Sequence, residues 1–230
     1  MQVIARRLSL IGRQWHSDKD RRSVLKRFAL WKSEVNLLPS ASPHTARLLV
    51  VRLDDIGDYL LFRNQLAVYK RSARWAGRRI TLLGNASWRP LFELLDADTV
   101  DEVLWVDKNR YLENAPYRQT IWRALRDGGF ETVIAASCTR PLLLDDLCLL
   151  AAAPVHSLGN VNTNVHPDWN RLSDALYGTL FRAPRALMHE FHFNAAFATW
   201  ACGLQYAGSR PAIESGLIPH RTGTGSIHAR

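Results

Sequence analysis

The chain has 230 residues, of which 47% are hydrophobic, and a net charge of +9, so it can bury a core and is not a disordered tail. No apolar run reaches the roughly 18 to 20 residues of a membrane-spanning helix, and the first residues lack the apolar core of a signal peptide. Because Cys138, Cys148 and Cys202 match no zinc, redox or disulfide pattern, we expect a cytoplasmic protein, soluble or peripheral to a membrane.

Residues 1–46 are expected to form a basic helical extension and a linker. Residues 1–47 hold ten Lys and Arg against three Asp and Glu, seven of the nine net positive charges. Between a capping residue, Ser17, and Pro39, apolar residues recur at helical spacing, namely Val24, Leu25, Phe28, Trp31 and Val35. Such a basic amphipathic helix could lie on an anionic membrane face. Packing on its own domain with a solvated basic side is the favoured alternative. The segment "LPSASPHTA", 38–46, is typical of a linker.

From residue 47 to residue 205 the pattern alternates between strands and helices. Strands are expected at 47–53, 78–85, 101–107, 131–137 and 154–159, and helices from 57 and at 87–95, 116–130, 140–153 and 189–204. This alternation predicts an α/β, Rossmann-like domain with a mostly parallel sheet and helices on both faces. Ligands of such sheets bind beyond the carboxyl ends of the strands. Residues 206–230, rich in Gly, Ser, Pro and Arg, are expected to form a poorly ordered tail.

The stretch "VVRLDDIGDYLLFRN", 50–64, places three carboxylates around one glycine at the end of the first strand. Gly57 lacks a Cβ and so permits close approach of a ligand to the backbone. Asp58 lies at the start of the next helix, where it is either a helix cap or a general base that accepts the proton of a hydroxyl nucleophile. Asp54 and Asp55 are either turn residues or part of the same site.

Other candidate sites in the sequence are weaker. Arg52 and Arg63 flank the loop and could contact phosphate groups of a ligand, although surface solvation is an equal alternative. A metal is not expected, because adjacent Asp54 and Asp55 lack the Asp-x-Asp spacing, and "HEFH" at 189–192 lacks a third ligand. The eight tryptophans accompany no nucleic-acid motif, so no nucleic-acid partner is expected.

The stretch "LLVVRLDDIGDYLLFRNQLAVYKR", 48–71, followed by "ITLLGN", 80–85, resembles the opening of glycosyltransferase family 9, the lipopolysaccharide heptosyltransferases. The shared pattern is an apolar strand, a basic residue, a short loop, Gly-Asp and a helix. The resemblance continues to "MHEFHFNAAFATWACGL", 188–204, which is similar to the family's His-containing helix between domains.

The resemblance implies that the chain is the acceptor-side, N-terminal half of a GT-B glycosyltransferase. The family's proposed base corresponds to Asp58, with Asp55, Gly57, Arg52 and Arg63 as acceptor-binding residues. The implied reaction is inverting transfer of heptose from ADP-heptose to a hydroxyl of a lipopolysaccharide-type acceptor, with no metal or other cofactor. A non-catalytic, Rossmann-like ligand-binding module is the alternative function.

Two departures from the family pattern affect these expectations. Phe62, Arg63 and Asn64 stand where many members have Thr and Pro, which leaves the acceptor open. No second βα domain follows residue 205, so the nucleotide-sugar donor would bind only if another domain were supplied. We therefore expect a truncated product that is weakly active or inactive alone, because stabilisation of the leaving diphosphate is usually a large part of catalysis.

Overall fold

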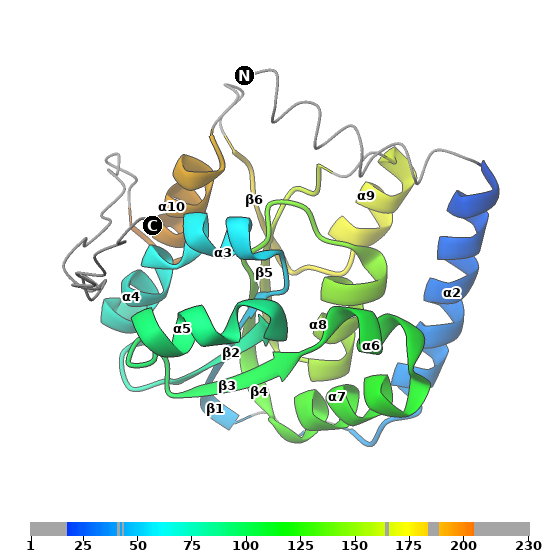
Figure 1. Ribbon diagram of the computed structural model, residues 1–230, viewed down its shortest axis with the longest axis horizontal. Helices are drawn as coiled ribbons and strands as arrows, with labels where there is room; N and C mark the ends of the chain where they lie inside the picture. Colours follow the sequence, from blue (N-terminus) through cyan, green and yellow to red (C-terminus); the bar gives the residue numbers. More distant parts are fainter. Residues whose placement is uncertain (1–17, 41, 43, 164–165, 184–188, 205–230) are drawn as a thin grey trace, which may run out of the picture.

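Strand β1 (His44–Arg52) lies inside a six-stranded sheet, and every paired strand in it is parallel. The computed structural model describes residues 18–40, 42, 44–163, 166–183 and 189–204 (Figure 1). The strand order is β3-β2-β1-β4-β5-β6. The other strands are β2 (Arg79–Asn85), β3 (Glu102–Val106), β4 (Phe130–Ala135), β5 (His156–Asn160) and β6 (Thr179–Phe181). The order reverses between β1 and β4, so the topological switch point lies where these two strands end.

The central strand β1 is buried on both faces. Leu48 and Val50 belong to one hydrophobic cluster, whereas Leu49 and Val51 belong to the other. Successive side chains of a strand point to opposite faces, so each of these residues anchors a different layer of helices.

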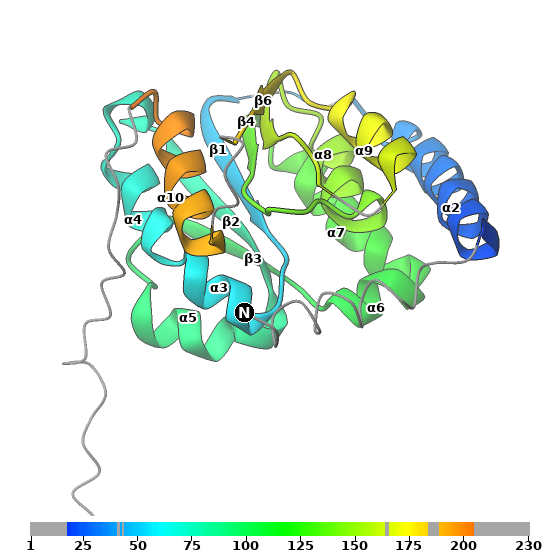
Figure 2. The same cartoon turned by 90° about the horizontal axis from the view of Figure 1, so that it is seen from above.

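Helices cover both faces of the sheet (Figure 2). One layer contains α3 (Ile56–Phe62), α4 (Asn64–Arg71), α5 (Arg89–Leu95) and α10 (Glu190–Ala201). The other contains α2 (Asp18–Asn36), α6 (Lys108–Glu113), α7 (Ala115–Asp127), α8 (Leu147–Ala152) and α9 (Pro167–Asp174). Short 3-10 turns lie at η1 (Ala73–Trp75) and η2 (Ala86–Trp88). The predicted Rossmann-like α/β class is therefore confirmed.

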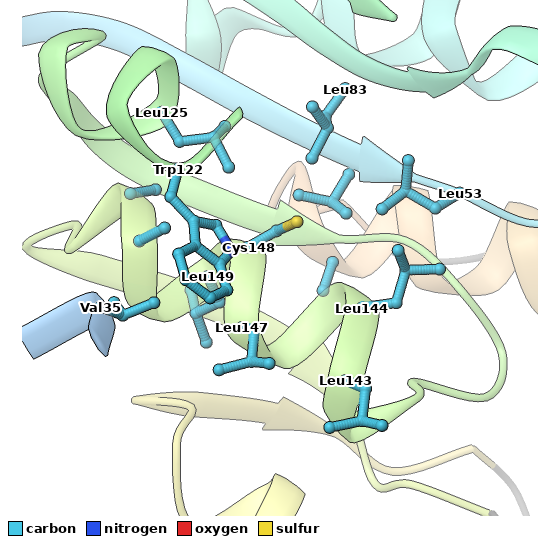
Figure 3. Close-up of a cluster of buried hydrophobic side chains, with 14 of the residues drawn as sticks. Val35, Leu53, Leu83, Trp122, Leu125, Leu143, Leu144, Leu147, Cys148 and Leu149 are labelled. Atoms are coloured by element: carbon cyan, nitrogen blue, oxygen red, sulfur yellow. The ribbon is translucent and has the colours of Figure 1, made fainter. Parts of the chain in front are cut away.

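A π-helical turn, η3 (Leu142–Asp146), leads into α8 on the face of the sheet that α2 and α7 cover. Figure 3 shows Leu143 and Leu144 from this turn in the same cluster as Trp122 and Leu125 of α7 and Leu83 of β2. The turn also buries Asp145 and Asp146. A π-turn adds a residue to a helical turn and is often found at functional sites.

Helix α2 uses its apolar side within this core. Val24, Phe28, Trp31 and Val35 are buried with the side chains of α7 and α8. The Trp31 ring meets the rings of Tyr111 and Trp122 edge-on at 6.4 and 6.3 Å, and the Arg118 guanidinium lies 3.7 Å from its centroid. The favoured alternative for this helix, packing on its own domain, is confirmed for the described residues. Ser17, its predicted cap, lies outside them.

Several sequence-based boundaries were wrong. The helix expected at 87–95 begins at Arg89, because a 3-10 turn forms at Ala86–Trp88, where the Asn85 side chain accepts a hydrogen bond from the Ser87 N–H at 3.1 Å. The expected linker at 38–46 overlaps β1, which begins at His44. Helices α6 and α9 and strand β6 form where the sequence predicted no element. The expected tail, 206–230, lies outside the described residues.

In the part of the chain that the structure describes, no helix combines the length and apolar character needed to cross a bilayer.

The packing of α2 predicts how strongly it supports the domain. Trp31→Ala should lower the free energy of unfolding by about 3–5 kcal/mol, because it leaves a cavity among aromatic rings. Trp31 is 6% exposed, whereas its neighbour Leu30 is 58% exposed. Leu30→Ala is therefore the control, with an expected change within about 0.5 kcal/mol. Urea unfolding followed by circular dichroism measures both. Equal changes in the two variants would contradict the packing of α2 into this core.

Candidate active site

Arg52, the last residue of β1, organises the carboxyl edge of the sheet at the switch point. Its side chain is 0% exposed. Its nitrogens contact five protein groups: the Ala136 carbonyl at 2.6 Å, Asn194 Oδ1 at 3.3 Å, the Asp58 carbonyl at 3.2 Å, Glu190 Oε1 at 2.7 Å and Asp54 Oδ2 at 3.0 Å. A buried charge is tolerated only when it is paired and hydrogen-bonded. The guanidinium therefore joins the ends of β1 and β4, the first turn of α3, and α10.

The environment of Arg52 keeps it charged. Burial alone would lower its pKa, but the charges of Asp54 and Glu190 more than compensate, and the pKa is raised above its ordinary value. The guanidinium also lies 4.9 Å from the centroid of the Phe62 ring.

Helix α10 brings Glu190 and Asn194 to this edge from far along the chain. These residues are four apart, so they lie on the same side of the helix. Asn194 also donates a hydrogen bond to the Leu61 carbonyl at 3.2 Å, which holds α10 beside α3 (Figure 2). His189 caps the helix, because its Nδ1 accepts a hydrogen bond from the Phe191 N–H at 3.2 Å. Sequence reasoning identified His189 but missed Glu190 and Asn194.

Asp58 lies in the first turn of α3, in a partly buried position next to Arg52. Arg52 binds its backbone carbonyl. Burial and the charges of Glu190 and Asp54 raise the pKa of the Asp58 carboxyl to about 6, although Arg52 and a backbone hydrogen bond from Asp55 act in the opposite direction. Asp58 is therefore a stronger base than an ordinary aspartate and is still largely ionised at neutral pH.

Asp55 and Gly57 lie beside Asp58 on the outer side of the loop. Asp55 is the N-cap residue of α3, yet its side chain makes no capping hydrogen bond and is 72% exposed, with an ion pair to Lys108 at 2.5 Å. A Cβ placed on Gly57 would meet nothing within 4 Å. The fold itself therefore does not require glycine at this position.

Arg63 is occupied by another carboxylate. It donates to both oxygens of Asp96 at 2.8 Å and to the Leu95 carbonyl at 3.3 Å, and Tyr59 also contacts Asp96. This network ties the junction of α3 and α4 to the end of α5. Acceptor contacts by Arg52 and Arg63 stay predictions, and the structure gives both residues a role in holding elements together.

Two further carboxylates lie behind the loop. The buried Asp145 accepts a hydrogen bond from Ser137 Oγ at 2.8 Å, and burial, followed by the charge of Asp54, raises its pKa to about 8. Its neighbour Asp146 accepts a hydrogen bond from the Tyr177 hydroxyl at 3.0 Å and forms an ion pair with Arg140, whose Nε lies 3.7 Å away. The sequence cue was two acids within an apolar run.

Within the described residues, no group of three or more His, Cys, Asp or Glu side chains is placed to hold a metal ion.

Comparison with solved structures finds glycosyltransferases of the same fold. The chain is similar to a glycosyl transferase family 9 structure from Veillonella parvula DSM 2008, with a TM-score of 0.55, 16% identity, and 75% of this chain matched to 46% of that one. It is also similar to E. coli heptosyltransferase WaaC with ADP, with a TM-score of 0.53, 17% identity, and 71% of this chain matched to 50% of that one. For WaaC with ADP-2-deoxy-2-fluoro heptose the TM-score is 0.52 and the identity is 15%, and 72% of this chain matches 51% of that one.

These likenesses show the fold alone, because the identities are low. The chain spans about half the length of the structures that it matches. No protein-family model and no curated protein matches the sequence.

The environment of Asp58 predicts a pH-dependent cost to stability. The carboxyl binds its proton more tightly in the folded chain, so its contribution to stability falls as the pH rises from about 4 to about 6 and stays low above that. Asp58→Asn should therefore raise the free energy of unfolding by about 1–2 kcal/mol at pH 8 and by much less at pH 4. The expected value at pH 8 is kept small because the carboxyl is partly exposed to solvent.

Urea unfolding at the two pH values measures this difference. Asp98→Asn is the matched control, since Asp98 is exposed after α5, and it should change neither value. A destabilised Asp58→Asn at pH 8 would contradict the raised pKa, because the ionised carboxylate would then stabilise the folded chain.

Proposed function

We propose that this domain binds the acceptor in a glycosyltransferase reaction and that Asp58 is its general base. Support comes from the position of Asp58, which lies at the switch point of a Rossmann-like sheet whose solved neighbours are glycosyltransferases. The single observation that carries the proposal is a partly buried carboxylate there with a pKa near 6.

The proposed chemistry is a direct displacement at a sugar carbon. The acceptor hydroxyl oxygen attacks the anomeric carbon of the donor sugar, and a carbon–oxygen bond forms with inverted configuration. The bond to the nucleoside diphosphate breaks, and the diphosphate departs with the electron pair. Asp58 takes the hydroxyl proton, and Arg52 holds the Asp58 backbone so that the carboxylate is already positioned.

The finer assignments follow the family resemblance. We propose a donor of ADP-heptose type, since a solved neighbour is described with ADP and with a fluorinated ADP-heptose. The proposed acceptor is a lipopolysaccharide-type glycan, reached from the cytoplasmic side, with contact to the inner membrane through the basic N-terminal region. The donor would bind to a second domain, because a GT-B site lies between two.

A non-catalytic ligand-binding module is the second candidate function. Such a module would bind the acceptor through the same loop without turnover.

Transfer assays with Asp58→Asn test the proposed base. The chain is assayed for donor hydrolysis and for sugar transfer, alone and mixed with the product of any adjacent reading frame that encodes a donor domain. Loss of a general base should lower the rate of transfer by about 10²- to 10⁴-fold, with circular dichroism unchanged.

Asp98→Asn again serves as the control and should transfer at the parental rate. An Asp58→Asn variant that transfers normally would exclude Asp58 as the base. Acceptor binding without turnover in every mixture would favour the binding module.

A further inference from the structure

The end of α2 borders a cavity of about 410 Å³, which we call the α2 cavity. Its walls also include residues of α7, the end of α8 and the start of β5, among them Arg126, Leu149, Ala153 and Ser157. Because β5 begins here, the cavity lies at the opposite edge of the sheet from the loop that holds Asp58. Its volume is within the range of small-molecule sites. The cavity is therefore separate from the candidate active site.

Arg126 is the charged residue in the wall of the α2 cavity. It donates to the carbonyls of Ala151 at 2.7 Å, Leu150 at 3.1 Å and Pro39 at 3.2 Å. The first two carbonyls belong to the last turn of α8, where no later helical N–H can reach them, so Arg126 caps this helix. A guanidinium has five N–H groups, and these three bonds leave two for a ligand.

The charge of Arg126 is balanced by no acidic side chain in the part of the chain that the structure describes. Its bonds there go to backbone carbonyls, and burial lowers its pKa with no neighbouring carboxylate to offset the effect. The buried Arg52 and Arg140, in contrast, each pair with two carboxylates. A partly buried cation without a counter-ion favours an anionic ligand.

Polar groups in the same wall can add hydrogen bonds to an anion. The Ser157 hydroxyl accepts a bond from the Gly178 N–H at 2.9 Å, and its own O–H can donate in turn. The Asn36 amide, at the end of α2, is exposed and also lines the cavity. A phosphate has several oxygens that accept such bonds, and its geometry suits the planar guanidinium of Arg126.

Two exposed apolar side chains lie next to lining residues in the chain. Leu37, between the lining residues Asn36 and Leu38, is 85% exposed, and Val155, which follows the lining residue Pro154, is 61% exposed. Single exposed apolar residues are common on protein surfaces, but two beside one cavity offer area that an apolar ligand group would remove from water. The cavity thus combines a cation with apolar surroundings.

We propose that the α2 cavity binds an amphiphile with a phosphate head and an alkyl chain, in which Arg126 contacts the phosphate and Leu37 and Val155 contact the chain. A soluble alkyl phosphate and a phospholipid of a bilayer present these same groups. The inference does not depend on Asp58 or on sugar transfer.

Three ligands separate the contribution of the head from that of the chain. Hexyl phosphate has both groups, hexanol has the chain without the charge, and inorganic phosphate has the charge without the chain. Binding to the full chain is measured by NMR titration at pH 7. Hexyl phosphate should bind about tenfold or more tightly than either of the others, because charged hydrogen bonds and apolar burial each contribute.

Arg126→Gln tests the contact with the phosphate. It should weaken the binding of hexyl phosphate by about tenfold and change that of hexanol by less than about twofold. Arg71→Gln is the matched control, since it removes an exposed positive charge from α4, in the layer on the other face of the sheet (Figure 2), and should change neither affinity. Circular dichroism checks that the loss of the α8 cap leaves the fold intact.

Leu37→Ala tests the contact with the chain without touching the core. It should weaken the binding of hexyl phosphate by about threefold or more and leave that of inorganic phosphate unchanged. Leu94→Ala is its control, because Leu94 on α5 is 65% exposed and lies in the other helix layer. This control should bind all three ligands as the parental chain does.

Cosedimentation with vesicles of phosphatidylglycerol and phosphatidylcholine in equal parts distinguishes the two sources of the ligand. Sedimentation that Arg126→Gln and Leu37→Ala both weaken would identify a bilayer lipid. Binding of hexyl phosphate without sedimentation would identify a soluble amphiphile. The proposal is overturned if hexyl phosphate binds no more tightly than inorganic phosphate, or if neither variant weakens its binding.

Discussion

The burial of the Arg52 guanidinium is the interaction on which the carboxyl edge of this sheet depends. Moving such a charge out of water costs several kcal/mol unless charged partners and hydrogen bonds replace the solvent. Asp54 comes from the loop after the same strand, but Glu190 lies 138 residues along the chain. Pairing them requires that α10 return to the switch point and pack against α3. The need to neutralise one side chain thus brings distant segments to the candidate site.

The same arrangement makes Asp58 more basic. Arg52 binds the backbone carbonyl of Asp58, while Asp54 and Glu190 share its positive charge. Burial and these two acids outweigh the guanidinium in their effect on the Asp58 pKa. The contacts that stabilise the edge therefore also produce a carboxylate with a raised pKa, whose ionised form is costly to the folded state. This conflict between stability and reactivity is common at functional sites.

A second buried arginine supports the other half of the sheet in a similar way. Arg140, also 0% exposed, donates to Asn160 Oδ1 at 2.9 Å and to Asp174 Oδ1 at 2.7 Å, and it contacts the Asn160 carbonyl. It therefore joins the segment after β4 to the end of β5 and to α9. Two guanidinium groups hold the carboxyl ends of the central strands, where a parallel sheet leaves its last backbone groups without strand partners.

The sequence by itself determined the fold class and the position of the candidate site. Apolar strands alternating with helices predict a parallel sheet, and the acidic loop at the end of the first strand directs attention to Asp58. Only the tertiary structure decided what surrounds that residue. Arg52 is buried because Glu190 and Asn194 of α10 bind its guanidinium, and the packing of α10 on α3 brings these two residues to it. Local pattern cannot specify such pairings, because the energy that orders them comes from contacts between residues far apart in the chain.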